Sequence, residues 1–134
     1  MEFVRWAAAR LPVYLISDTY TVRSHVIDQI LRSDGLIDLF RERLYSDVIG
    51  VQKPSPEAVA HILTATGLPA NALVHIGDLL DRDAEMARKA GCFCILLQDT
   101  DQGRAGAADL GEHVLATCPS FRDVQQVLVD YLDV

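Results

Sequence analysis

The sequence predicts an α/β protein, a three-layer α/β/α sandwich with helices on both faces of a parallel sheet. Short apolar runs alternate with amphipathic helical patterns, one pair roughly every 20–25 residues, as in βαβ units. The apolar runs are hydrophobic on both faces, which is typical of buried parallel strands. No repeat, low-complexity tract or linker interrupts this alternation, so we expect a single domain over residues 1–134.

The first third of the chain contains the first such alternation. A helix is expected over Phe3–Leu11, where Pro12 ends it, and the run Val13–Ile16 (VYLI) is a strand candidate. Thr21 is the expected N-cap of the next helix, which ends at Gly35. The apolar stripe of that helix consists of Val22, Val26, Ile27, Ile30 and Leu31.

The rest of the chain continues the pattern, with proline near helix starts and glycine at helix ends. In order, we expect a weaker strand over Arg43–Val48, a helix from Pro54 to Gly67, a strand over Ala72–Ile76, a helix over Asp83–Ala90, and strands over Phe93–Leu97 and His113–Ala116. Ser120 is the expected N-cap of a final helix that turns Phe121, Val124, Val127, Leu128 and Leu132 inward.

The charge and hydropathy of the sequence argue against some classes of binding partner. The net charge of −7 and the pI of about 4.9 argue against binding to nucleic acid or to anionic membranes. No apolar run approaches the roughly 18 residues of a membrane span. We expect Cys92, Cys94 and Cys118 to be small buried residues in a reducing compartment, and the protein to be cytoplasmic.

Polar residues follow the expected strands, at the sheet edge where α/β proteins bind ligands. Ser17 follows the first strand, Lys53 comes after the second, Asp78 follows the third and Asp99 the fourth. A hydroxyl and an ammonium group suit a phosphoryl group, and carboxylates suit a hard cation such as Mg²⁺. These residue types therefore predict a site for a phosphorylated ligand with a divalent metal.

The same residues lie in three motifs whose order is informative. Tyr14–Ser17 reads as three hydrophobic residues and a serine, Lys53–Pro56 reads K-P-x-P, and Gly77, Asp78 and Asp83 form GDxxxxD ahead of A-x-x-A-G. This series resembles the haloacid dehalogenase (HAD) superfamily, in its phosphatase-like branch related to β-phosphoglucomutase and phosphoglycolate phosphatase. The resemblance implies a Rossmann-like, HAD-like sheet.

The resemblance covers Val13 to about Leu97 and implies a role for each matching residue. Ser17 would donate a hydrogen bond to the transferring phosphoryl group, and Lys53 would stabilise the nucleophile and the phosphoryl charge. Asp78 would be a metal ligand, and Asp83 would either support the metal or orient Lys53. The implied cofactor is Mg²⁺ and the implied substrate is a small phosphorylated molecule.

Members of the superfamily also carry a D-x-D nucleophile motif on a strand that precedes the serine motif. The segment MEFVRWAAARL contains no aspartate, so we expect a truncated core without that strand and without a cap domain. Mg²⁺ binding is then expected to be weak or absent. Asp99-Thr100-Asp101 would suit a circularly permuted enzyme, although a polar loop is the favoured interpretation; Asp81 lies at the wrong spacing for the second acid and is expected to face solvent.

Two functions remain open. The chain is either a phosphatase-type core that is incomplete or inactive by itself, or a non-catalytic HAD-like module that binds a ligand or partner. Without the shared central strand, Val13–Ile16 and Ala72–Ile76 either pair with each other or are covered by another chain. We expect the second outcome, a homodimer or a complementing chain.

Overall fold

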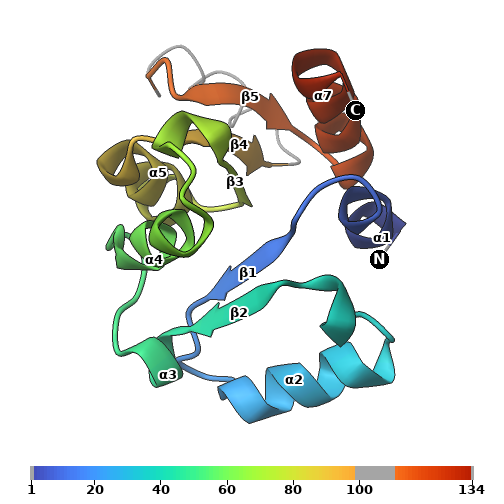
Figure 1. The fold of residues 1–134 in the computed structure, drawn as a ribbon, viewed down its shortest axis with the longest axis vertical. Helices are drawn as coiled ribbons and strands as arrows, with labels where there is room; N and C mark the ends of the chain where they lie inside the picture. The colour runs from blue at the N-terminus through green and yellow to red at the C-terminus, as the bar shows by residue number, and fades with distance from the viewer. Residues whose placement is uncertain (1, 99–110, 134) are drawn as a thin grey trace. The chain divides into compact units, whose positions relative to one another are not determined.

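The structure is a computed structural model that describes residues 2–98 and 111–133. Helices and parallel strands alternate along the chain, which confirms the predicted α/β class (Figure 1). The strands are β1 (Tyr14–Ser17), β2 (Glu42–Tyr45), β3 (Val74–Gly77), β4 (Phe93–Leu97) and β5 (Val114–Cys118). The α-helices are α1 (Glu2–Ala8), α2 (Ser24–Ser33), α3 (Ser46–Ile49), α4 (Glu57–Thr66), α5 (Glu85–Ala90) and α7 (Phe121–Leu132).

The chain divides into two compact units, Met1–Gln52 and Lys53–Val134, and each has its own parallel sheet. In the first unit β1 pairs with β2, so that Tyr14 lies opposite Glu42 and Ser17 opposite Tyr45. In the second unit the strand order is β3-β4-β5. Both sheets have the parallel pairing that the apolar runs predict.

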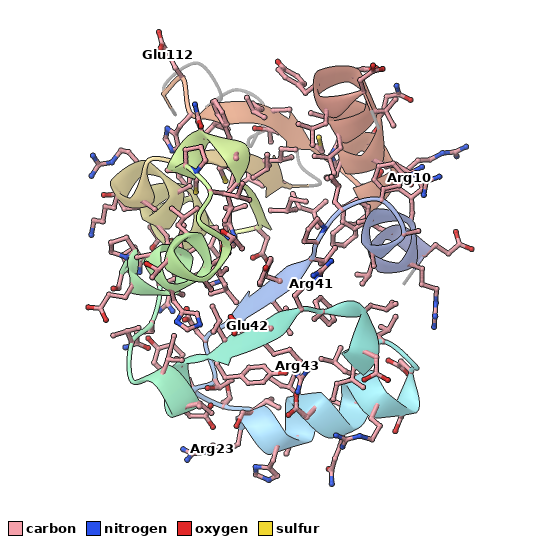
Figure 2. All side chains as sticks on the ribbon, viewed as in Figure 1. Arg10, Arg23, Arg41, Glu42, Arg43 and Glu112 are labelled. Atoms are coloured by element: carbon pink, nitrogen blue, oxygen red, sulfur yellow. The ribbon has the colours of Figure 1, made fainter. Side chains whose placement is uncertain are left out.

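A polar cluster links α2 to β2 within the first unit. Asp28 Oδ1 accepts hydrogen bonds from the Tyr45 hydroxyl at 2.7 Å and from Arg43 Nε at 2.8 Å. Arg43 and Tyr45 are two positions apart on β2 and therefore share one face of the strand. Figure 2 shows Arg43 directed from β2 toward α2. The cluster thus fixes the helix to the strand through one carboxylate.

The same contacts set the ionisation of this cluster. The hydrogen bond from Tyr45 is the main reason that the pKa of Asp28 lies below its usual value, and Arg43 lowers that pKa further. Burial and the neighbouring Asp28 raise the pKa of Tyr45 from 10.0 to about 12. Both shifts favour a neutral tyrosine hydroxyl that donates to an ionised carboxylate.

The predicted start of α2 is wrong. The helix begins at Ser24 with Arg23 as its N-cap, while Thr21 and Val22 lie exposed before it. Asp47, which follows β2 in the chain, accepts a hydrogen bond from the Ser24 backbone N–H at 3.1 Å. A carboxylate from elsewhere in the unit thus supplies the cap, so the local threonine is not needed.

The strand predicted over Arg43–Val48 is shorter in the structure. β2 ends at Tyr45, and the chain turns directly into the single helical turn of α3. In α2, Ile30 lies exposed although the apolar stripe placed it inward.

The core of the second unit is built on β4. This strand has the predicted bounds, and Cys94, Ile95 and Leu96 are fully buried at the centre of the sheet. In Figure 1, α4 and α5 lie together on one side of the strands and α7 on the opposite side. These helices contribute fully buried side chains at Val59, Met86, Ala87 and Val124.

The final helix confirms its predicted N-cap, since Ser120 Oγ accepts a hydrogen bond from the Asp123 backbone N–H. Val124 and Leu128 are buried, as the stripe predicts. Phe121 and Leu132 are exposed instead of inward, because they lie at the two ends of α7 beyond the packed turns.

The cysteines and the helix lengths bear on two predictions made from composition. Cys92, Cys94 and Cys118 are buried and form no disulfide, as expected. None of the helices that the structure describes has the length and apolar character needed to cross a membrane.

The cluster at Asp28 predicts a measurable effect of Tyr45→Phe. Removing a hydrogen bond to an ionised carboxylate should lower the free energy of unfolding at neutral pH by about 1 to 2 kcal/mol. Because folding raises the pKa of Tyr45 to about 12, its contribution is complete below pH 10.0 and is lost as the pH rises toward 12. The variant should therefore lose less stability than the parent chain across this alkaline window.

Urea unfolding at a series of pH values measures both effects. Tyr131→Phe is the matched control, because Tyr131 is exposed on α7. Equal stability losses in the two variants would contradict the prediction.

Candidate functional site

The segment between β3 and α5 turns back on the strand that precedes it. After Gly77 the chain passes Asp78 and enters a π-helical turn, Leu80–Ala84. The turn brings the Asp83 side chain against the end of β3, where a Cβ at Gly77 would lie 2.1 Å from Asp83 Cγ. Only glycine leaves room for the carboxylate here, which explains the glycine of the GDxxxxD motif.

Asp83 is a buried carboxylate whose two oxygens are both used. Oδ1 accepts hydrogen bonds from Lys53 Nζ at 2.8 Å and from His75 Nε2 at 2.7 Å. Oδ2 accepts one from the Leu79 backbone N–H at 3.0 Å. The Asp83 side chain is 1% exposed, so these three donors replace the water that solvates a free carboxylate.

The electrostatics of the site follow from these contacts. Burial by itself would raise the pKa of Asp83, but the hydrogen bonds from His75 and Lys53 outweigh it and hold that pKa well below its usual range. Asp83 is therefore ionised, and an ionised carboxylate only accepts hydrogen bonds. It follows that His75 carries a proton on Nε2 and acts as the donor.

Sequence reasoning found Lys53 and Asp83 but missed His75. His75 lies in the predicted apolar strand ALVHI, where it is the polar residue of the run. His75 and Gly77 are two positions apart, so both face the same side of β3. Because Asp83 occupies the space above Gly77, its carboxylate also contacts the ring of His75. The sequence signal that could have identified His75 is a polar residue two positions before the glycine of the GDxxxxD motif.

The other two acids of the segment lie in solvent. Asp78, at the end of β3, and Asp81, in the π-helical turn, are both exposed, and for Asp81 this confirms the expectation. Asp81 and Asp83 also have the D-x-D spacing of a nucleophile motif. The oxygens of Asp83 are engaged by Lys53, His75 and Leu79, which argues against Asp83 as the acid/base of such a motif.

The residues fit a magnesium ion in part. Residues 2–98 and 111–133 contain no group of three or more histidine, cysteine or acidic side chains placed to hold a metal. Asp78 offers one exposed carboxylate, and Mg²⁺ in proteins is often held by one or two carboxylates with water and phosphate oxygens. Asp83 would have to give up a hydrogen bond to join it.

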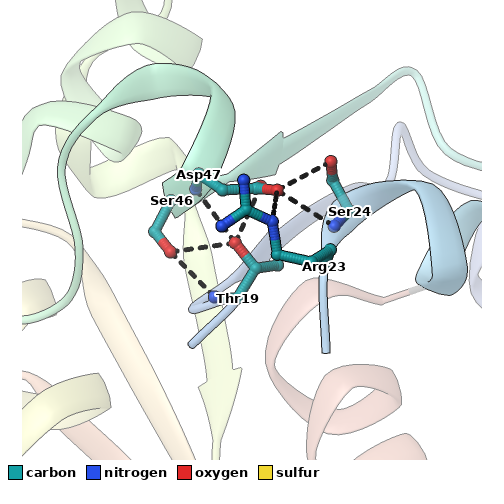
Figure 3. Close-up of polar contacts among 5 residues, drawn as sticks. All are labelled: Thr19, Arg23, Ser24, Ser46 and Asp47. Atoms are coloured by element: carbon teal, nitrogen blue, oxygen red, sulfur yellow. Dashed lines mark hydrogen bonds and ion pairs between the residues drawn. The ribbon is translucent and has the colours of Figure 1, made fainter. Parts of the chain in front are cut away.

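Ser17 belongs to the first unit, where a second polar cluster holds the loop that follows it. Figure 3 shows this cluster, which joins the loop after β1 to the start of α3. Ser46 Oγ accepts from the Thr19 backbone N–H at 2.7 Å, and the Thr19 hydroxyl donates to Asp47 Oδ1 at 2.8 Å. Asp47 Oδ2 accepts from the backbone and hydroxyl of Ser24.

This cluster closes the loop on both sides. Thr19 is buried, and the Asp47 backbone N–H donates back to its hydroxyl at 2.9 Å. The hydrogen bonds from Thr19 and then Ser24 lower the pKa of Asp47, with a further contribution from Arg23. The sequence did not predict this cluster, because Asp47 lies within the range predicted as the strand Arg43–Val48.

The structure therefore brings together two of the four predicted site residues, Lys53 and Asp83, and places Asp78 exposed at the end of β3 in the same unit. Ser17 lies at the end of β1 in the first unit. The Asp99–Asp101 pair lies outside the described residues.

Comparison with known proteins decides the family. The family model described as haloacid dehalogenase-like hydrolase matches residues 1–91 of the 134. The chain belongs to this family. The chain is 32% identical over 93 residues to a haloacid dehalogenase-like hydrolase domain-containing protein of Arabidopsis thaliana, covering 64% of this chain and 36% of that protein.

A second relative is the glyceraldehyde 3-phosphate phosphatase of Methanopyrus kandleri, 31% identical over 64 residues, with 48% of this chain and 28% of that protein covered. The HAD-like chain thus spans about a third of the length of these curated relatives. The structure of YfnB from Bacillus subtilis, which is bound to magnesium, has a TM-score of 0.80 at 18% identity, covering 95% of this chain and 53% of that one. This likeness shows the fold.

The close approach of Gly77 and Asp83 predicts a large cost for Gly77→Ala. The new Cβ would displace a carboxylate whose ion pair is buried, which should lower the free energy of unfolding by about 3 kcal/mol or more.

Gly67→Ala is the matched control. Gly67 has a φ of +71° with no atom within 4 Å of the added Cβ, so the substitution adds backbone strain of about 1 to 2 kcal/mol without a steric clash. Chemical denaturation compares the two variants, and a cost at Gly77 no larger than that at Gly67 would show that Asp83 moves freely.

Proposed function

We propose that this chain is the phosphoryl-binding core of a phosphatase-type hydrolase that acts on a small phosphorylated molecule. The observation that carries the proposal is the ion pair of Lys53 with the buried, ionised Asp83 in a chain of the HAD-like family. A carboxylate held in one place gives the ammonium group a fixed direction, as stabilisation of phosphoryl charge requires. The phosphatase relative from Methanopyrus kandleri supports this class of substrate.

Each of the other predicted residues has a proposed role. From the sequence motif, Ser17 donates its hydroxyl to a phosphoryl group, and the Thr19–Asp47 cluster of the first unit holds the loop that follows Ser17. Asp78 is the proposed Mg²⁺ ligand, and its exposure supports that role. Asp83 acts on Lys53 rather than on the metal. Mg²⁺ binding is weak, because one carboxylate with water is a poor cage for an ion that demands near-octahedral ligands.

Hydrolysis by this chemistry needs a nucleophilic carboxylate. That carboxylate attacks phosphorus, the P–O bond to the leaving group breaks as the leaving group takes up a proton, and water then hydrolyses the acyl phosphate. We propose that a complementing chain supplies the carboxylate, that a second copy of this chain contributes only by covering strand edges, and that the chain alone does not turn over phosphate esters. We also propose a cytoplasmic location, which the burial of Cys92, Cys94 and Cys118 without a disulfide between them supports.

Two measurements test the function. With an aryl phosphate and Mg²⁺, the purified chain should show no turnover; turnover that is lost in Asp99→Ala and kept in Asp109→Ala would instead support a permuted enzyme. Calorimetry with inorganic phosphate and Mg²⁺ should show binding that weakens roughly tenfold in Lys53→Met, because a charge-assisted hydrogen bond is lost.

Matched controls exist for both ligands. Lys89→Met alters an exposed lysine at the end of α5 and should leave phosphate affinity unchanged. Asp78→Ala should remove the enhancement of phosphate binding by Mg²⁺, whereas Asp81→Ala should not. Equal phosphate affinity in the Lys53 and Lys89 variants would overturn the proposal, and phosphate binding without turnover in a complemented protein would identify a binding module.

The proposed association with a second chain predicts that the protein is larger than a monomer in solution. In the first unit, β1 pairs with β2 along one edge, and its apolar residues are half-buried rather than buried within a two-stranded sheet. A second copy would satisfy the backbone groups of such an edge. Gel filtration with light scattering should show a species larger than one chain, and a single peak at 14.8 kDa that persists at high concentration would contradict this.

A further inference from the structure

His75 donates to the carboxylate that holds Lys53, although it belongs to none of the three sequence motifs. We propose that His75 is a positioning residue, which fixes through Asp83 the direction in which Lys53 presents its ammonium group. This role rests on the proposed function for the ligand that Lys53 contacts. The arrangement of the Lys53, Asp83 and His75 side chains does not depend on that function.

The argument begins with the flexibility of lysine. Lys53 carries its charge on a four-carbon stem, so the direction of the ammonium depends on the acceptor that holds it. A carboxylate is a fixed acceptor only when both of its oxygens are held, since it otherwise turns about the Cβ–Cγ bond.

Two rigid donors hold Asp83. The backbone N–H of Leu79 holds Oδ2 at 3.0 Å, and the His75 ring holds Oδ1 at 2.7 Å. His75 is itself fixed, because it lies on β3 opposite Cys94 in the parallel ladder with β4. Among the described residues, the flexible Lys53 would be the remaining donor to Oδ1 without His75.

The same two donors set the direction of the carboxylate that Lys53 meets. The ammonium lies on Oδ1 at 2.8 Å, beside the imidazole, while the Leu79 backbone N–H donates to Oδ2. His75 donates from Nε2 to an ionised carboxylate, so that nitrogen is not available to accept a proton or to ligate a metal. Its contribution is therefore geometric, exerted on Asp83 and through it on Lys53.

Substitutions at position 75 separate this role from simple packing. Glutamine places an N–H donor near the position of Nε2 and should preserve the arrangement, whereas leucine fills similar space without a donor. Asparagine is polar but shorter, so its amide does not reach Asp83. If His75→Leu fails to fold, the comparison of His75→Gln with His75→Asn decides the same question.

The readout is the ammonium signal of Lys53 in a chain labelled with ¹⁵N-lysine. Lys53 and Lys89 are the lysines of the sequence, and the exposed Lys89 serves as an internal reference. Ammonium protons that are buried and hydrogen-bonded exchange slowly enough to be observed. We expect a Lys53 signal in the parent chain and in His75→Gln, and its loss or broadening in His75→Leu and His75→Asn.

Affinity for inorganic phosphate with Mg²⁺ is measured on the same samples and should fall roughly tenfold where the Lys53 signal is lost. An unchanged Lys53 signal in folded His75→Leu or His75→Asn would overturn the positioning role. A signal that responds as expected while no variant binds phosphate would uphold the positioning role and overturn the proposed function.

Discussion

The buried charge of Asp83 is the constraint on which the second unit depends. A carboxylate with 1% exposure is tolerated in a protein only when hydrogen bonds replace its hydration, and three donors do so here. Those donors come from a residue ahead of α4, from β3 and from the start of the turn before α5. The carboxylate thus ties three separate segments of the unit to one point.

Several features of the sequence follow from that requirement. Gly77 must lack a side chain because Asp83 takes its place, and the π-helical turn directs Asp83 back toward the strand. Removing one donor leaves an ionised group short of a partner, which is costlier than the loss of an exposed ion pair. The arrangement that stabilises the unit is also the one that orients Lys53, so stability and the proposed chemistry depend on the same atoms.

The first unit uses a related device with a different consequence. Asp47 holds the loop after β1 and caps α2, but its cluster lies nearer to solvent than that of Asp83. The Asp47 side chain is 11% exposed, against 1% for Asp83, so water lies closer to the Asp47 cluster. A carboxylate closes the loop after a strand in both units, and the one in the first unit is less deeply buried.

The sequence by itself determined the features that arise from local pattern. The alternation of apolar runs and helical stripes predicted the order of the elements, the bounds of β4 and the Ser120 cap, because strand burial and N-capping depend on residues close together in the chain. The ordered motifs likewise placed Lys53 and Asp83 in one predicted site, and left open whether Asp83 supports a metal or orients Lys53.

Only the tertiary structure decided which distant groups meet. Thr21 had the right chemistry to cap α2, yet Asp47 does so from beyond β2, and His75 reached Asp83 because a π-helical turn folds back on the strand. A hydrogen bond between residues far apart in sequence depends on the path of the backbone between them, and local propensity does not specify that path. For the same reason, the apolar stripe did not predict that Phe121 lies exposed at the end of a helix whose middle turns are buried.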